Sequence, residues 1–313
     1  MTRSIPKRSH RRRRNAAVAA AVVAFVSQLA GVAEARPYKV VSCDSAGLFA
    51  YNASAWVPYG TAGRAYAACP SGGGDVAGIS NRMTGGTFAG FAGSGHAFTA
   101  PPGTTITNIR WAGRIAREAC YWGAYIRAQP SGAAVLGAPP NQFCGTTGID
   151  ARNFPLTFPV PDGTTRLEQL VVCGATQCQP GATLHSQQLE VTIEDPTPPS
   201  ISIGGPLASG RWVSGVAGDP SADLTVTDNA GVRSVGVLVP DESTAYGAPC
   251  DWSETRPCAT SLSVAAKPKL AKLTDGRHLL RVSAEDAAGN PASVATDILV
   301  DNTPPEPIVP QVA

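Results

Sequence analysis

The residue types that could carry out hydrolysis are present in this chain, but their spacing does not suit that chemistry. A retaining glycosidase holds two carboxylates about 5 Å apart, which a strand achieves with a pattern such as E-x-D-x-x-E. The acids of the first 195 residues do not follow it, although Glu190 and Glu194 share one face of an expected strand. Ser94, in Ala92-Gly93-Ser94-Gly95-His96, lacks the glycine two positions earlier that a nucleophile elbow requires. We therefore predict no catalytic residue and a structural role for His96.

Acids beside turns in the C-terminal part raise a calcium hypothesis, since carboxylate oxygens suit Ca²⁺. They are Asp219, Asp223, Asp228, Glu285 and Asp286. No EF-hand spacing accompanies them, and an Asp that bonds to its own backbone explains the same residues as turn formers. The cysteines contain no C-x-x-C pair of the kind that holds zinc. The sequence therefore favours turns over calcium here, and we predict no metal and no cofactor.

A group of aromatic and basic residues favours binding over catalysis. Strand alternation over residues 119–128 places Tyr121, Tyr125 and Arg127 on one face, while Arg110 and Arg114 share a face of the preceding strand. If these two strands pair, the five side chains form one platform on which sugars can stack and bond to guanidinium groups. The alternative is an ordinary half-solvated sheet in which arginine stems cover aromatic rings. We predict a ligand site here, and an extracellular glycan or another cell-envelope component as the partner.

The N-terminus has the features of an export signal. Residues 1–35 hold seven of the 25 Lys and Arg residues, an apolar stretch from 16 to 33, and the small residues Ala33 and Ala35 around a cut after Ala35. Removal of this segment leaves 18 basic and 22 acidic residues, a net charge of −4, which argues against a nucleic-acid partner. We predict a secreted or surface-associated chain with no membrane contact after cleavage; a retained anchor is the alternative.

Eight cysteines, all beyond the signal, agree with an oxidising compartment. Two of them lie in the C-terminal part and have only each other as a close partner. For the other six several connectivities remain open, and we favour pairing between neighbours. The expected pairs are Cys43–Cys69, Cys120–Cys144, Cys173–Cys178 and Cys250–Cys258.

A repeated proline motif divides the chain. Asp195-Pro196-Thr197-Pro198-Pro199 and Asp301-Asn302-Thr303-Pro304-Pro305 share the pattern D-x-T-P-P, and the interval between them has the size of one immunoglobulin-like sandwich. Proline pairs keep a chain extended, so we expect Asp195 to Pro199 to be an exposed hinge with few contacts. The predicted segments are a signal at 1–35, one module at 36–195, a second at 196–305 and a short tail at 306–313.

The second module resembles a known family. The turn Ala284-Glu285-Asp286-Ala287-Ala288-Gly289-Asn290 and the exit Asp301 to Pro305 are similar to the A-x-D-x-A-G-N and D-N-T-P-P segments of bacterial Ig-like domains. Short alternating strands at 224–227, 232–239, 278–284 and 295–300 accompany them. The resemblance implies an Ig-like β-sandwich that acts as a spacer or adhesion module.

The first module reads as all-β, with strands expected at 38–43, 95–99, 104–115, 119–128, 166–173 and 188–194. Its segment Gly95 to Thr104, G-x-A-F-T-A-P-P-G-T, resembles exported proteins of high-GC bacteria that join a concanavalin-like or jelly-roll sandwich to Ig-like domains. The predicted fold class is therefore a lectin-like β-sandwich followed by an Ig-like β-sandwich. The predicted function is non-catalytic binding outside the cell. The alternatives are a polysaccharide hydrolase with an Ig-like accessory and a structural envelope protein.

Overall fold

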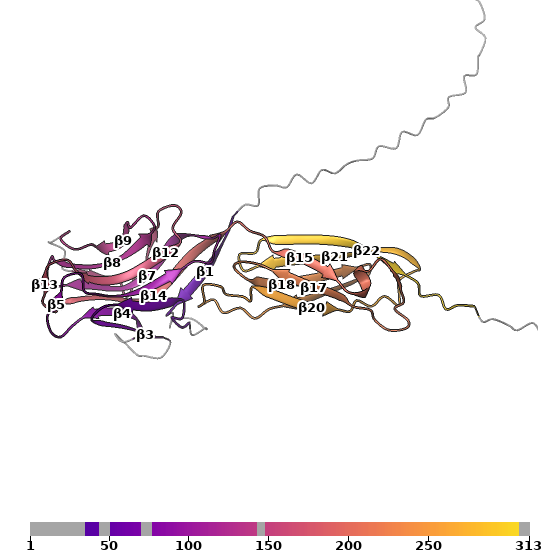
Figure 1. The fold of residues 1–313 in the computed structure, drawn as a ribbon, viewed down its shortest axis with the longest axis horizontal. Coiled ribbons are helices and arrows are strands. Elements are labelled where there is room, and N and C mark those ends of the chain that lie inside the picture. Colours follow the sequence, from indigo (N-terminus) through magenta and orange to yellow (C-terminus); the bar gives the residue numbers. More distant parts are fainter. Residues whose placement is uncertain (1–34, 44–50, 70–76, 143–147, 307–313) are drawn as a thin grey trace, which may run out of the picture. The chain divides into compact units, whose positions relative to one another are not determined.

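The computed structural model describes residues 35–43, 51–69, 77–142 and 148–306, and its regular elements are strands apart from one short 3-10 turn, η2 (Pro206–Ala208). The all-β prediction is confirmed (Figure 1). Over the described ranges, no helix has the length and apolar character needed to cross a membrane. The predicted signal, residues 1–35, lies outside these ranges except for Ala35.

The first sandwich consists of two antiparallel sheets, coloured indigo to pink in Figure 1. Its larger sheet has the order β10-β7-β14-β4-β3, with β1 also paired to β14 and β11 to β7. The strands of this sheet are β1 (Arg36–Ser42), β3 (Arg64–Ala68), β4 (Gly78–Met83), β7 (Thr105–Arg117), β10 (Gly148–Asp150), β11 (Leu156–Pro159) and β14 (Ala182–Asp195).

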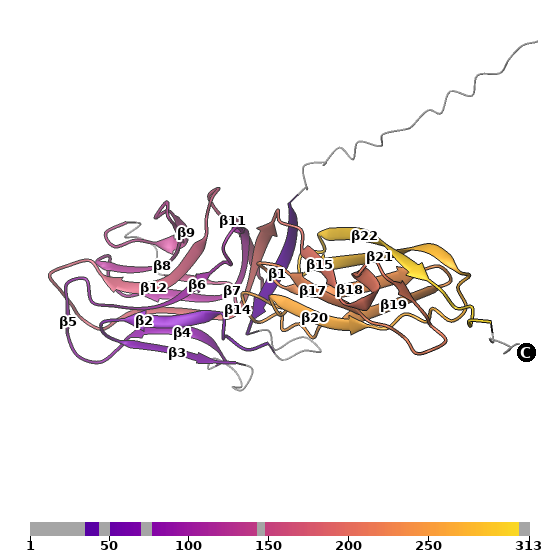
Figure 2. The same ribbon diagram turned by 45° about the vertical axis from the view of Figure 1, so that its right-hand side comes forward.

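The smaller sheet of the first sandwich has five strands in the order β2-β6-β12-β8-β9. In Figure 2, β8, β9 and β12 of this sheet lie above β3 and β4 of the larger sheet. A two-stranded ribbon, β5 (Phe88–Ala89) with β13 (Gln177–Cys178), accompanies the two sheets. The five strands are β2 (Trp56–Gly60), β6 (Gly93–Thr99), β8 (Trp122–Gln129), β9 (Ala134–Ala138) and β12 (Arg166–Cys173).

The two sheets of this sandwich enclose one apolar core. Phe98 of β6, Trp111 of β7 and Trp122 of β8 are fully buried in it, and burying side chains of this size stabilises a fold by about 1.5–3 kcal/mol each. Successive side chains of a strand point to opposite faces. The buried Ile109 and Trp111 therefore turn Arg110 to the outside of the larger sheet.

The second sandwich, orange to yellow in Figure 1, has a core of its own. A three-stranded sheet, β15-β17-β20, packs against a five-stranded sheet, β16-β22-β21-β18-β19. Apolar and exposed residues alternate regularly along β17 and β21, as in sheets with one solvated face. The strands are β15 (Ser200–Gly204), β16 (Trp212–Val213), β17 (Ala222–Thr227), β18 (Val232–Val239), β19 (Glu242–Gly247), β20 (Ser261–Ala266), β21 (Gly276–Asp286) and β22 (Pro291–Val300).

Three disulfides confirm the expected pairing of neighbouring cysteines. Cys120 is also disulfide-bonded, but Cys144, its expected partner, lies outside the described residues. The confirmed bonds are Cys43–Cys69, Cys173–Cys178 and Cys250–Cys258.

The expectation of an exposed hinge at Asp195 to Pro199 is wrong at both ends. Pro196 to Pro198 are exposed, but Asp195 is completely buried and Pro199 is buried as well. Its carbonyl oxygen accepts a hydrogen bond of 2.9 Å from Asn290 Nδ2 in the second sandwich. Residues from Ala33 onward form one compact unit, because loops of the second sandwich pack on the end of the first, with Ala230, Cys258 and Ala287 joining the first core.

Candidate functional site

The outer face of the smaller sheet carries two tyrosines in one cross-strand row. The register of the five strands aligns one residue from each in a single row. In the order β2, β6, β12, β8 and β9, these residues are Tyr59, Gly95, Leu170, Tyr125 and Gly137. Residues aligned in this way share a face of the sheet. The inward neighbours of Tyr125, Ala124 and Ile126, are fully buried in the core.

Glycines in the sheet allow bulky groups to lie directly on it. A Cβ added to Gly95 would lie 2.4 Å from the Tyr59 ring, and one added to Gly123 would lie 2.6 Å from Pro140. Real Cβ atoms do not approach other atoms so closely, so a side chain at either position would have to displace the Tyr59 ring or Pro140. Tyr59 and Pro140 thus stand as two walls above the floor that Leu170 and its neighbours form.

The space between these walls is a cavity of about 600 Å³, within the range of small-ligand sites. Its lining includes Tyr59, Tyr125, Arg127 and Leu170. Phe91 also lines it, with 86% of its surface exposed and a left-handed backbone φ of 64°. Among the described residues, no Asp or Glu contributes to this lining.

A charged row follows the tyrosine row on the same face, where Glu168 of β12 lies opposite Arg127 of β8. Arg127 Nε donates to Glu168 Oε2 at 2.6 Å, and Arg166 Nε donates to Oε1 at 3.0 Å. Burial alone would raise the pKa of Glu168, but the hydrogen bond and charge of Arg127 outweigh it and hold that pKa below its ordinary value. Burial, together with the nearby Glu168 charge, raises the pKa of Tyr59 to about 12. The site therefore presents a fixed ion pair beside the neutral phenol group of Tyr59.

The structure separates the five residues of the predicted platform. Tyr125 and Arg127 line the cavity. Tyr121 precedes β8 and packs near Trp122, with ring centroids 6.1 Å apart, and it does not line the cavity. Arg110 and Arg114 lie on β7, in the other sheet of the sandwich. The two strands do not pair, so the condition on which the five-residue platform depended is not met.

The five predicted residues are separated because of the way the chain connects β7 to β8. Strands adjacent in the sequence are neighbours only about two-thirds of the time. Here the chain after Arg117 crosses from the larger to the smaller sheet, so that β7 pairs with β10, β11 and β14, while β8 pairs with β9 and β12. Trp111 and Trp122 face the shared core, which leaves Arg110 and Tyr125 on the two outer faces of the sandwich.

The sequence does not identify the other two aromatic residues of the cavity, Tyr59 and Phe91. Tyr59 follows Pro58, and a proline inside an apolar run weakens a strand prediction. Phe91 lies in the turn after β5, where no periodic pattern marks it. The cue that points to this region is the glycine density of residues 85–95, which allows close approach to a sheet.

His96 belongs to a polar network buried between the two sheets. Its Nδ1 lies 3.2 Å from Asn81 Oδ1, which also accepts from Gln169 Nε2 at 3.0 Å. Ser186 Oγ donates to Gln169 Oε1 at 2.5 Å and accepts from Trp111 Nε1 at 2.7 Å. Burial lowers the pKa of His96 to about 4, so the ring is neutral at pH 7. These partners agree with the structural role expected for this histidine.

The turn interpretation of the C-terminal acids holds for two of them. Asp228 Oδ1 accepts from the backbone N–H groups of Ala230 and Gly231, both at 2.8 Å. Asp286 Oδ1 accepts from the N–H of Asn290 at 2.8 Å. The same two acids lie close to Asp195.

The comparisons with known proteins are weak. No protein-family model and no curated protein matches the chain. The glycoside hydrolase domain of Endo-D from Streptococcus pneumoniae is similar over 78% of this chain and 37% of its own, with 13% identity and a TM-score of 0.20. The adhesin domain of Epf from Streptococcus pyogenes is similar over 87% of this chain and 93% of its own, with 10% identity and a TM-score of 0.26. The chain spans little more than a third of the Endo-D domain, and TM-scores this low carry no argument about function.

Proposed function

We propose that this chain is an exported, non-catalytic binding protein whose first sandwich holds a glycan between Tyr59 and Tyr125. The observation that carries the proposal is the tyrosine row over Leu170, in a cavity of about 600 Å³. A pyranose ring has an apolar C–H face that packs on aromatic rings, while its hydroxyls need polar partners. Arg127 at the floor and the exposed Phe91 at the rim offer both kinds of contact.

The disulfides support export, because such bonds form and persist in oxidising compartments. Cys43–Cys69 and Cys173–Cys178 lie in the first sandwich and Cys250–Cys258 in the second. Location outside the cell would also bring the cavity into contact with envelope or environmental glycans.

Polysaccharide hydrolysis is the competing proposal. It needs two carboxyl groups about 5–10 Å apart on either side of the scissile bond, one of them protonated. The carboxylate nearest to the cavity in register is Glu168, whose two oxygens are engaged by Arg127, Gln129 and Arg166. Its lowered pKa keeps it ionised, which suits a positioning role better than that of a general acid.

A glycan array followed by titration calorimetry tests the proposal. The purified protein is screened first, and affinity for the best glycan is then compared among wild type, Tyr59→Ala and Phe91→Ala. Phe154→Ala is the matched control, because that side chain is 77% exposed and does not line the cavity. Loss of a stacking ring, worth on the order of 1–3 kcal/mol, weakens binding about tenfold or more.

Three results would overturn the proposal. They are the absence of glycan binding, an affinity of Tyr59→Ala equal to that of wild type, and an equal loss in the Phe154→Ala control. Release of new reducing ends from the bound glycan would instead support the hydrolase.

A further inference from the structure

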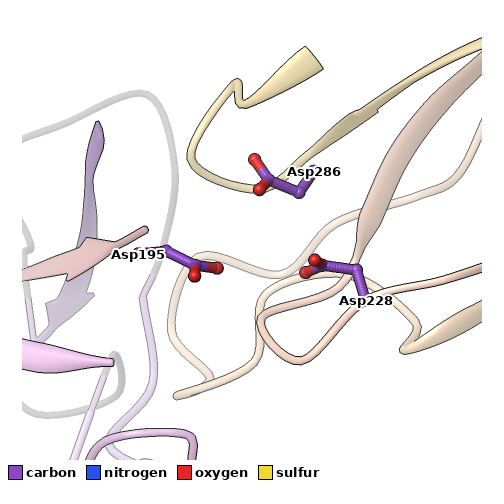
Figure 3. A group of neighbouring side chains, drawn as sticks. All are labelled: Asp195, Asp228 and Asp286. Atoms are coloured by element: carbon purple, nitrogen blue, oxygen red, sulfur yellow. The ribbon is translucent and has the colours of Figure 1, made fainter. Parts of the chain in front are cut away.

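Three aspartates converge where loops of the second sandwich meet the end of the first. Asp195 ends β14, Asp228 follows β17 and Asp286 ends β21. One carboxylate oxygen from each lies within 4.8 Å of those of the other two. Figure 3 shows the three carboxylates gathered around a common space, from segments far apart in the sequence.

Turn formation does not account for all the oxygens of this cluster. Asp195 and Asp286 are completely buried and Asp228 is 9% exposed. Asp195 Oδ1 accepts from the Thr197 N–H at 2.9 Å, and Asp228 Oδ1 accepts from the Ala230 N–H in its own turn at 2.8 Å. The Oδ2 atoms of Asp195 and Asp228 are buried and have no hydrogen-bond partner among the described residues, and the same is true of Asn229 Oδ1.

Among the described residues, no ion pair joins a positive side chain to these three aspartates. The ion pairs of the described part of the chain involve other acids, such as Glu168 and Glu190. Buried carboxylates without a counter-charge repel each other and favour their neutral forms. Burial raises the pKa of all three aspartates, that of Asp228 to about 6. A cation bound in the shared space would lower the electrostatic cost of these buried negative charges at neutral pH.

We propose that Asp195, Asp228 and Asp286 bind a calcium ion. The donors are hard oxygens with no nitrogen or sulfur among them, which is the set that Ca²⁺ prefers. Two oxygens bound to one Ca²⁺ at 2.3–2.6 Å are at most about 5 Å apart, so the 4.8 Å limit on the three carboxylates fits one shared ion. Water would complete the 6–8 ligands of the ion.

The site would tie the two sandwiches together. Asp195 is the last residue of the first sandwich, whereas Asp228 and Asp286 come from two turns of the second. An ion that bonds to all three therefore has to leave when the sandwiches part. Calcium should accordingly raise the temperature at which the junction opens, and it should do so without any change in the glycan cavity.

Calorimetric titration of CaCl₂ into chelator-treated protein tests the proposal, together with thermal unfolding at several calcium concentrations. We expect a Kd between about 10⁻⁵ M, that of the weakest sensor sites, and about 10⁻³ M, that of the weakest extracellular modules. We also expect a melting temperature that rises with calcium. Asp195→Asn is the informative variant. Its amide keeps the Oδ1 acceptor for Thr197 and places an N–H group opposite Asp228, so it folds without the ion and loses the calcium response.

Asp219→Asn is the matched control, since this exposed aspartate of the same sandwich is outside the cluster. Its calcium response should equal that of wild type. No binding heat and no thermal shift at about 10 mM calcium, far above the expected Kd, would overturn the proposal. A wild-type response in folded Asp195→Asn would place the ion elsewhere and overturn it equally. Glycan affinity of Asp195→Asn is unchanged in either case, which separates this test from that of the cavity.

Discussion

Asp228→Asn should stabilise the calcium-free protein at neutral pH, and the gain should shrink on acidification. Burial, reinforced by the charges of Asp286 and Asp195, raises the pKa of Asp228 from 3.8 to about 6. The folded state thus holds the proton more tightly than the unfolded state. The contribution of Asp228 to the free energy of unfolding therefore becomes unfavourable as the pH rises from about 4 through 6.

The magnitude follows from the two pKa values. A difference of about two units, at 1.36 kcal/mol per unit, gives a penalty of about 3 kcal/mol above pH 7. Protonation of the folded state relieves about 2 kcal/mol of this penalty between about pH 7.5 and pH 4.5. The asparagine variant has no charge to bury, and its amide oxygen can still accept from the N–H groups of Ala230 and Gly231.

The assay has to compare the unfolding free energies of two proteins, because His96 changes the pH dependence of stability in the opposite direction. Its pKa falls from 6.5 to about 4 on burial, so this histidine removes stability as the pH drops below 6.5. Wild type and Asp228→Asn share that contribution, and it cancels when their urea unfolding free energies are subtracted at each pH. A difference that does not change with pH, or a variant that is less stable at neutral pH without calcium, would refute the reasoning.

Three further predictions concern the first sandwich. Arg127→Ala should lower the free energy of unfolding by about 1–3 kcal/mol in denaturant titration, because it leaves the buried Glu168 carboxylate short of a partner. The exposed ion pair between Arg277 and Asp297 should contribute only about 0–1 kcal/mol. Equal costs for the loss of the two pairs would contradict this. Gly95→Ala should displace the tyrosine ring above it and weaken ligand binding, while Gly247→Ala, where an added Cβ meets nothing within 4 Å, should leave binding unchanged. Cys43→Ser opens a disulfide with a sequence separation of 26 residues and should cost about 3 kcal/mol; an unchanged urea midpoint would show that the bond contributes nothing.

Strand alternation identifies elements that are long and regular. The strands expected at 166–173 and 232–239 match β12 and β18 to the residue, because eight-residue runs rich in Val and Leu are a strong local signal for a strand. Short edge strands such as β10 and β16 are missed, since two or three residues cannot show a period. Local pattern therefore predicts where strands are, and leaves their partners to long-range packing.

The same limit explains which site residues could be predicted. Tyr125 and Arg127 follow from alternation within one strand, and the structure places both at the cavity. Arg110 could not be assigned, because its sheet depends on whether β7 and β8 form a hairpin or cross between sheets. Asp195, Asp228 and Asp286 belong to three segments whose meeting is set by the packing of loops on the first sandwich.

A comparison of the two D-x-T-P-P copies shows that turn formation does not explain the burial of Asp195. In both, the aspartate accepts a bond from the backbone N–H two residues later, Thr197 at 2.9 Å and Thr303 at 3.3 Å. The local chemistry of the motif is therefore the same at both ends of the second sandwich. Asp301 does this while exposed to solvent, whereas Asp195 does it fully buried beside two other acids. Because an exposed aspartate makes the same turn, the turn does not require burial, and the buried Oδ2 of Asp195 needs a cause of its own, which a shared cation provides.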